Sequence, residues 1–187
     1  MGRDVNRLLY ILGEEIEELL RIVDALELPD AWIAGGYIRN RCWNYQHGFN
    51  KPQNDVDVIY FDPSLTYKQS LAFEEDVQAE LTKLHTGFEW SLTNQAWTHT
   101  YKDDAPYTDS WSAVSRYPET CTAIACQMVG DYSIRTCAPH GLQDLFDLVI
   151  RPTPGFRRGE RLHGMFRERV YGRTWLKTWP NLRVKDR

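Results

Sequence analysis

The sequence predicts one α/β domain of the α+β kind, in which a short mixed sheet is flanked by helices. Two long segments repeat apolar residues at intervals of three and four, a spacing typical of amphipathic helices. Short runs of strand length stand between and after them, either apolar throughout or alternating apolar with polar. The chain has 187 residues, 42% of them hydrophobic, which is enough to bury one core of this kind.

The first part of the chain predicts a helix, a strand, a glycine turn and a second helix. Residues 5–26 carry the apolar spacing of an amphipathic helix, and Pro29 follows where a helix-stopping residue is expected. Residues 31–34 are an apolar run that ends at Gly35 and Gly36, after which a helical pattern resumes.

The middle of the chain predicts two strands joined by a helix. Residues 55–61 alternate and then become fully apolar, as a central strand does, and residues 88–93 alternate with period two. Between them, residues 66–84 predict a second amphipathic helix with Glu74 on its outer face. The spacing predicts an inner face made of Leu71, Phe73, Val77, Leu81 and Leu84.

The pattern is less regular after the third strand. Residues 97–111 are polar and aromatic without a period, which predicts a loop, and a short helix is predicted over residues 121–125. Residues 125–129 and 132–135 are then typical of a hairpin whose turn is Gly130–Asp131.

The charge is divided unevenly along the chain. Residues 1–150 carry 11 Lys and Arg against 23 Asp and Glu, whereas residues 151–187 carry 11 against 3. We therefore expect a body over residues 1–153 and a basic extension over residues 154–187. The extension either offers a nucleic-acid surface or folds back over the acidic body and covers its cleft. The second alternative is favoured, because a sequence pI of about 5.7 gives no general attraction for polyanions.

Composition also bears on location. The chain shows neither an apolar run of membrane-spanning length nor the opening pattern of a signal peptide. Its four cysteines form no CxxC pair, so buried free thiols are expected. These features predict a cytoplasmic protein with no membrane partner.

Two pairs of residues indicate chemistry. Asp55 and Asp57 alternate with valines on one strand, so both carboxylates point to the same face and repel one another unless a cation neutralises them. A hard divalent ion such as Mg²⁺ binds oxygen ligands of this kind together with substrate phosphates. Gly35 and Gly36 have no Cβ atoms, so the start of the helix after them is open to a phosphate.

This combination resembles the polymerase-β-like nucleotidyltransferase superfamily, whose signature is a Gly-Gly or Gly-Ser turn followed by Asp-x-Asp on the adjacent strand. Within it, residues 30–153 look like a bacterial family of small nucleotidyltransferase-like proteins. The segments that carry this resemblance are Trp32–Asn40, Trp43, His47–Gly48, Asp55–Asp62, Asn94–Ala96 and Ala138–Leu145.

The resemblance implies a reaction and its cofactor. Gly35 and Gly36 would hold the triphosphate of a nucleotide, and Asp55 and Asp57 would bind Mg²⁺, with two ions expected and Mn²⁺ able to replace them. Such enzymes transfer a nucleoside monophosphate from a nucleoside triphosphate to an acceptor hydroxyl, which this sequence does not specify, while pyrophosphate leaves.

The sequence departs from the family pattern at the third acid. The resemblance places that acid where this chain has Ser91. Glu89 lies two residues earlier on the same strand face, about 7 Å away, and is predicted to replace it as the third catalytic and metal-binding carboxylate. The alternative is a non-catalytic nucleotide-binding or regulatory protein that has kept the fold.

Four further residues are candidates for nucleotide binding. Arg39 would either contact a phosphate or pair with the two aspartates, and Asn40 would bind nucleotide or cross-link the turn. Asn94 and Gln95 follow the third strand and would either bond a base or ribose or position the loop.

Overall fold

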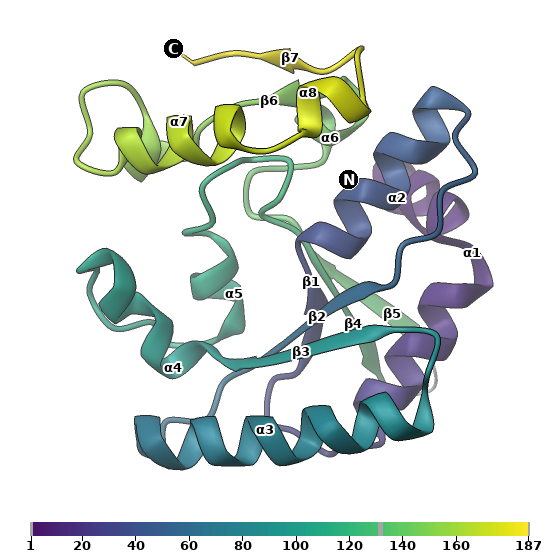
Figure 1. Ribbon diagram of the computed structural model, residues 1–187, viewed down its shortest axis with the longest axis vertical. Helices are drawn as coiled ribbons and strands as arrows, with labels where there is room; N and C mark the ends of the chain where they lie inside the picture. Colours follow the sequence, from purple (N-terminus) through teal and green to yellow (C-terminus); the bar gives the residue numbers. More distant parts are fainter. Residues whose placement is uncertain (1, 131–132, 187) are drawn as a thin grey trace.

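The computed structural model describes residues 2–130 and 133–186. Within these residues the main sheet has five strands in the order β3-β2-β1-β4-β5, in which β2 and β3 are parallel and the other neighbours are antiparallel (Figure 1). The predicted short mixed sheet is confirmed. Its strands are β1 (Trp32–Ala34), β2 (Asp55–Tyr60), β3 (Glu89–Asn94), β4 (Ala125–Val129) and β5 (Ser133–Cys137).

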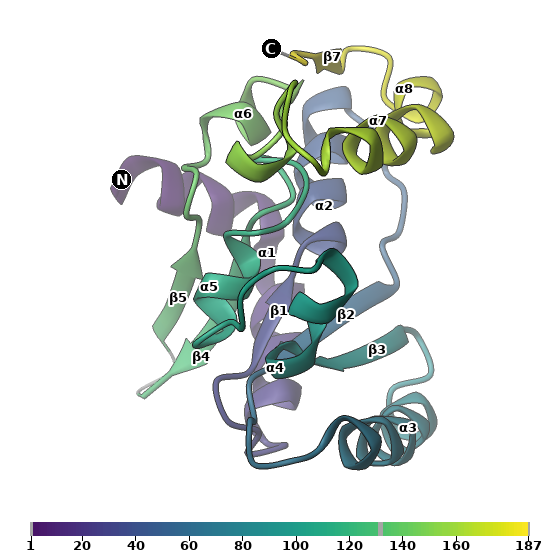
Figure 2. The ribbon, with the colours of Figure 1, turned by 90° about the vertical axis from the view of Figure 1, so that its left-hand side faces the viewer.

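Helices lie on both sides of this sheet (Figure 2). α1 and α2 pack on each other and on one face, and α3 packs along β3. None of the described helices has the length and apolar character needed to cross a membrane. The helical segments are α1 (Gly2–Asp24), α2 (Gly36–His47), α3 (Tyr67–Leu84), α4 (Gln95–Thr98), η1 (His99–Lys102), α5 (Ser110–Val114), α6 (Gln143–Phe146), η2 (Pro154–Phe156), α7 (His163–Gly172) and α8 (Trp175–Thr178).

The alternation of side chains along β2 decides where the site lies. Val56 and Val58 point into the main core, which the sheet shares with α1, α2 and α3. Ile59 points to the opposite face, where it joins a smaller apolar cluster with Val114 of α5. Asp55 and Asp57 lie on this second face because side chains two residues apart share a face. All four cysteines are buried free thiols, as the sequence predicts.

α1 confirms the helix predicted over residues 5–26 and adds a kink. Gly13 has φ 67° and ψ −164°, and the buried apolar residues continue on both sides of it. A positive φ is readily adopted by glycine, which has no Cβ. Beyond the kink, Glu15 accepts a hydrogen bond from the Tyr37 hydroxyl and pairs with Arg41 at 3.3 Å, which ties α1 to α2.

The predicted inner face of α3 is partly wrong. Leu71, Phe73 and Leu84 are exposed, whereas Glu74 is buried. The Glu74 carboxylate accepts a hydrogen bond from the backbone N–H of Asn94 at 2.6 Å, and burial raises the pKa of this carboxyl. Because α3 packs mainly against the edge strand β3, only a narrow stripe of its surface is buried, and this hydrogen bond fixes which stripe faces the sheet.

The segment predicted as a loop, residues 97–111, contains short helices that its composition does not indicate. α4 and η1 occupy its first part, and α5 begins at its end. The carboxylate of Asp109 accepts a hydrogen bond from the backbone N–H of Ser112 at 2.6 Å, which caps α5. Short polar helices of this kind have no apolar periodicity, so capping and tertiary contacts define them.

The helix predicted over residues 121–125 is wrong. The backbone N–H groups of Thr122 and Ala123 both donate to the carbonyl of Glu119, which closes a single turn before β4 begins. β4 and β5 then pair antiparallel, which confirms the predicted hairpin. Asp131 of its predicted turn and Tyr132 lie outside the described residues.

The basic extension packs onto the body. Trp175 and Trp179 both contact Trp43 of α2, with ring centroids 5.7 Å and 5.1 Å from it. The indole N–H of Trp179 donates to the side chain of Asn44 at 2.8 Å. A small parallel sheet of β6 (Val149–Ile150) and β7 (Arg183–Val184) joins the last residues to the same end of the molecule (Figure 1).

Candidate functional site

A cavity of about 910 Å³ lies on the second face of the sheet, between the strands and α7. Its floor comes from β2 and β3, one wall from the start of α2, another from the segment around Tyr117, and its roof from α7 and α8. Its lining includes Gly35, Gly36, Arg39, Asn40, Asp55, Asp57, Ser91, Gln95, Lys102, Tyr117, Thr122, Glu168, Arg169, Arg173 and Trp175.

The backbone favours glycine at position 35, and Gly36 lies against a carboxylate. Gly35 has φ 65°, a value that side chains disfavour. A Cβ on Gly36 would lie 3.5 Å from Oδ2 of Asp57, so the helix start and the carboxylate lie side by side. The N–H groups at the start of a helix have no partner within the helix and favour an anion such as phosphate. Here they lie next to the carboxylate of Asp57, so a phosphate bound there would need a cation to offset the repulsion between the two negative groups.

The register between β2 and β3 decides which residue of β3 lies beside each aspartate of β2, and the sequence does not show this register. Because β2 and β3 are parallel, Asp55 lies opposite Glu89 and Asp57 lies opposite Ser91. The Ser91 hydroxyl donates to Oδ1 of Asp57 at 2.7 Å, while Asn54 donates to Glu89 at 3.4 Å. Ser91 therefore occupies the place beside Asp57, and Glu89 is one step further out, beside Asp55.

The carboxylates on β2 and β3 repel one another. Burial raises the pKa of Asp55, and the carboxylates of Asp57 and Glu89 raise it further, while Arg173 and Arg39 oppose the shift. Among residues 2–130 and 133–186, no three acidic, histidine or cysteine side chains converge as a preformed metal site. The structure thus brings the two aspartates together in the cavity and leaves Glu89 outside its lining.

Replacement of Asp55 by asparagine is expected to stabilise the protein slightly at neutral pH. A raised pKa means that the folded protein binds a proton at Asp55 more tightly than the unfolded chain does. Stability from this group is therefore greatest at low pH and falls as pH rises above 3.8 through the raised pKa. The gain should not exceed about 0.5 kcal/mol, because the side chain is partly exposed.

Urea unfolding at neutral pH and below pH 3.8 measures this effect. The difference between Asp55→Asn and the parent should vanish in the acidic series. Asp76→Asn, on the exposed side of α3, is the control and should change neither series. A lower stability of Asp55→Asn at neutral pH would contradict the prediction.

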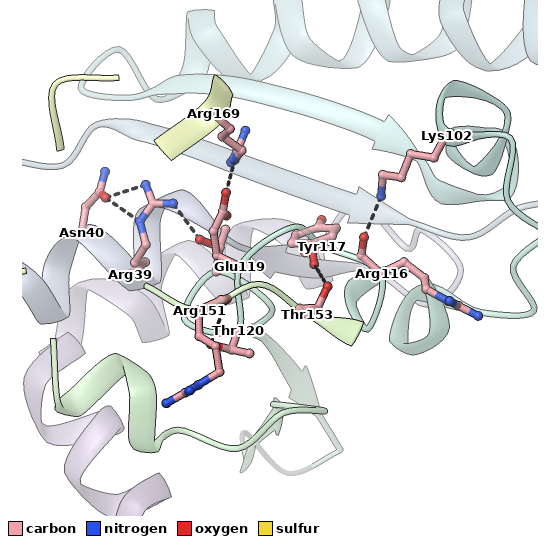
Figure 3. Close-up of polar contacts among 11 residues, drawn as sticks. Arg39, Asn40, Lys102, Arg116, Tyr117, Glu119, Thr120, Arg151, Thr153 and Arg169 are labelled. Carbon is pink, nitrogen blue, oxygen red and sulfur yellow. Dashed lines mark hydrogen bonds and ion pairs between the residues drawn. The ribbon is translucent and has the colours of Figure 1, made fainter. Parts of the chain in front are cut away.

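Arg39 is held under the cavity by neutral partners. It is 3% exposed, donates to Oγ1 of Thr122 at 2.8 Å and donates twice to Oδ1 of Asn40, at 3.1 and 2.8 Å (Figure 3). Burial lowers the pKa of Arg39 to about 10. Among the described side chains no ion pair joins Arg39 to Asp55 or Asp57. Asn40 cross-links the turn through Arg39 and also lines the cavity.

Asn94 and Gln95 occupy different surroundings. Asn94 is buried and bonds the backbone of Asp62 in both directions, at 3.0 and 2.7 Å, and the N–H of Ala96 at 3.1 Å. It thus positions the loop and lies outside the cavity lining. Gln95 does line the cavity, where it donates to the carbonyl of Thr93 at 3.3 Å.

Several lining residues were not identified from the sequence. Lys102, Tyr117 and Thr122 come from segments without a motif, and Arg169 and Arg173 come from the basic extension. For Arg169 and Arg173 there was one signal in the sequence, the positive charge of the extension together with the expectation that it folds over the acidic cleft. For the other three residues there was none.

Glu119 is a buried acid next to Arg169 of the cavity lining. Glu119 has no exposed surface, and Nε of Arg169 lies 2.8 Å from its Oε1 (Figure 3). The two groups form an ion pair, but among the described atoms neither Nε nor either carboxylate oxygen has a partner in hydrogen-bond geometry.

A glycine turn at the start of a helix, beside paired aspartates on the neighbouring strand of a mixed sheet, defines a polymerase-β-like nucleotidyltransferase fold. The chain belongs to a nucleotidyltransferase family, because the family model described as "Nucleotidyltransferase" matches residues 21–184. Comparison with curated protein sequences gave no match.

Solved structures agree with this fold. An NMR structure described as revealing a CCA-adding enzyme head domain is 33% identical, with a TM-score of 0.80, and the match covers 91% of this chain and 88% of that one. A CCA-adding enzyme in complex with ATP is 18% identical with a TM-score of 0.59, over 97% of this chain and 43% of that one. The Thermotoga maritima CCA-adding enzyme complexed with tRNA is 15% identical with a TM-score of 0.57, over 94% and 42%. This chain thus spans less than half of these two enzymes.

Proposed function

We propose that this cavity binds a nucleoside triphosphate with a divalent metal ion and that the chain transfers the nucleoside monophosphate to an acceptor hydroxyl. One observation carries the proposal: the N-terminus of α2 at Gly36 lies against the carboxylate of Asp57 inside a single cavity. A helix N-terminus favours phosphate, and paired carboxylates favour a cation. A metal–triphosphate complex supplies both.

The residues present fit one metal ion. Burial raises the pKa of Asp55, and the carboxylates of Asp57 and Glu89 raise it further; a bound cation would offset the repulsion among these carboxylates. Mg²⁺ commonly takes one or two protein carboxylates and fills its other positions with phosphate oxygens and water. When bound, such an ion stabilises the charge that develops on the transferred phosphate and the leaving pyrophosphate. A second ion would need Glu89, which lies outside the cavity lining.

The chain's own groups have separate tasks in this proposal. Ser91 holds the Asp57 carboxylate toward the cavity through its 2.7 Å hydrogen bond. Arg39, fixed by Asn40 and Thr122, presents its positive charge to the phosphates. The structural likeness to CCA-adding enzymes in complex with ATP and CTP supports a nucleoside triphosphate as ligand.

Calorimetric titration with ATP and CTP, in Mg²⁺ and in EDTA, tests the binding step. Asp57→Asn is expected to weaken metal-dependent affinity at least about tenfold, because a charge-assisted metal contact is lost. Asp76→Asn carries the same change on the exposed side of α3 and should bind as the parent does. A parent protein that binds neither nucleotide in Mg²⁺ would overturn the proposal.

A second candidate is nucleotide binding without transfer. It is favoured by Ser91, which stands beside Asp57 where the resemblance places an acid. Pyrophosphate release over a panel of acceptors, tRNA and small hydroxyl compounds included, separates the two candidates. Release that Glu89→Gln abolishes and Ser91→Ala retains supports transfer, whereas metal-dependent binding with no release supports the second candidate.

A further inference from the structure

The C-terminal end of α7 and the residue after it bring two arginines into the cavity beside a third. Arg169 lies in the last turn of α7 (His163–Gly172), and Arg173 directly follows the helix in extended backbone. Both line the cavity with Arg39. The three guanidinium groups surround one indole ring. Their central carbons lie 4.1 Å (Arg39), 5.5 Å (Arg169) and 5.6 Å (Arg173) from the ring centroid of Trp175.

Three positive charges gather around this ring. Burial is the main cause of the lowered pKa of Arg39, and Arg169 and Arg173 lower it further by repulsion. Glu119 is the carboxylate that pairs with Arg169. Among the described residues no carboxylate lies within ion-pair distance of Arg173. In the part of the chain that the structure describes, Arg169 is thus the one of the three arginines that has an ion pair, and the carboxylates of Asp55, Asp57 and Glu168 line the same cavity at longer range.

The arginines are held in place before any ligand arrives. The extension is anchored by the contacts of Trp175 and Trp179 with Trp43, and the Glu119 ion pair fixes the inner side of α7. Both oxygens of Glu119 are buried without a hydrogen-bond partner among the described atoms, so this acid is placed to hold Arg169 by charge. Repulsion among guanidinium groups held in this way is relieved by an anion.

We propose that Arg169 and Arg173, together with Arg39, bind the polyphosphate of the nucleotide from the roof of the cavity. The inference rests on the proposed function in that the ligand is the same nucleoside triphosphate. Guanidinium groups bind phosphate oxygens in pairs, and a polyphosphate carries enough charge to balance several of them. Residues 163–175 are thus part of the nucleotide site, and the phosphates lie between these arginines and the metal-binding aspartates.

The chain offers a matched control on α7. Arg167 is 58% exposed, pairs with Asp186 at 3.7 Å and is absent from the cavity lining. Arg167→Gln removes the same charge from α7 without removing a cavity group. If the extension instead bound polyanions through its general charge, Arg167→Gln and Arg173→Gln would have equal effects.

The test measures dissociation constants for three probes: ATP with Mg²⁺, AMP, and inorganic tripolyphosphate. Arg173→Gln is expected to weaken ATP and tripolyphosphate binding about tenfold and to change AMP binding less than about twofold, because AMP has a single phosphate. Arg173→Lys should lie between, since lysine keeps the charge and loses the paired hydrogen bonds. Arg167→Gln should match the parent. Thermal unfolding confirms that each variant is folded.

The outcomes separate this inference from the proposed function. Unchanged tripolyphosphate affinity in folded Arg173→Gln, or equal losses for AMP and ATP, overturns the arginine site while metal-dependent ATP binding can still stand. Arginine-dependent tripolyphosphate binding without metal-dependent ATP binding supports the arginine site and overturns the proposed function. A parent protein that binds no probe overturns both.

Discussion

Replacement of Trp43 by alanine is expected to lower the free energy of unfolding by about 3–5 kcal/mol, the range for large buried aromatic side chains. Trp43 has no exposed surface and lies where α2 meets the C-terminal extension. Its ring contacts Trp175 and Trp179, and the guanidinium of Arg39 lies 4.8 Å from its centroid. Alanine would leave an empty space under α8 and would remove the ring that Trp175 and Trp179 contact.

Urea unfolding measures this loss, and limited proteolysis locates it. In Trp43→Ala, cleavage should begin in residues 154–187, because the extension loses its main apolar anchor. Trp43→Phe should cost much less than alanine, since the Trp43 indole N–H has no hydrogen-bond partner among the described atoms. Trp111, 45% exposed on α5, is the control, and Trp111→Ala should change stability by less than about 1 kcal/mol. A Trp43→Ala protein as stable as this control would contradict the packing described here.

The replacement Ser91→Glu is expected to raise the rate of nucleotidyl transfer at least about 100-fold. Position 91 lies opposite Asp57 in the parallel pair, and the present hydroxyl is already 2.7 Å from the Asp57 carboxylate. A glutamate there would add the third acid next to the other two inside the cavity. Metal-assisted charge stabilisation is worth several kcal/mol, and each 1.36 kcal/mol is about tenfold in rate.

Pyrophosphate release at saturating ATP and Mg²⁺ measures the gain for Ser91→Glu. Ser91→Gln has the same size without the charge and should show no gain. In EDTA, Ser91→Glu should melt below the parent because a third like charge is added, and Mg²⁺ should raise its melting temperature more than the parent's. A Ser91→Glu protein that binds ATP and releases no additional pyrophosphate would show that the missing acid is not what limits transfer.

Local patterns predicted the strands and the two motifs well. The period-two alternation of residues 55–61 places Asp55 and Asp57 on one face whatever the rest of the chain does, because successive side chains on a strand point to opposite faces. Gly35 and Gly36 mark the turn before α2 for a similarly local reason, since Gly35 adopts a positive φ.

Predictions failed where a side chain's surroundings came from distant segments. Helical spacing predicted that Glu74 faces solvent, but its side chain points toward the sheet and accepts a hydrogen bond from the backbone N–H of Asn94. Helix α5 is capped by Asp109 inside a stretch whose composition resembles a loop. For Asn94, which was expected either to bind nucleotide or to position the loop, hydrogen bonds with the distant Asp62 show the second arrangement.

The sequence by itself determined the strands, the glycine turn and the shared face of Asp55 and Asp57, because each depends on residues close together in the chain. Only the tertiary structure decided which groups complete the cavity. The parallel register set Ser91 beside Asp57 and placed Glu89 further out, and packing on Trp43 brought Arg169 and Arg173 over the site. Register and long-range packing depend on contacts between segments that no local pattern encodes.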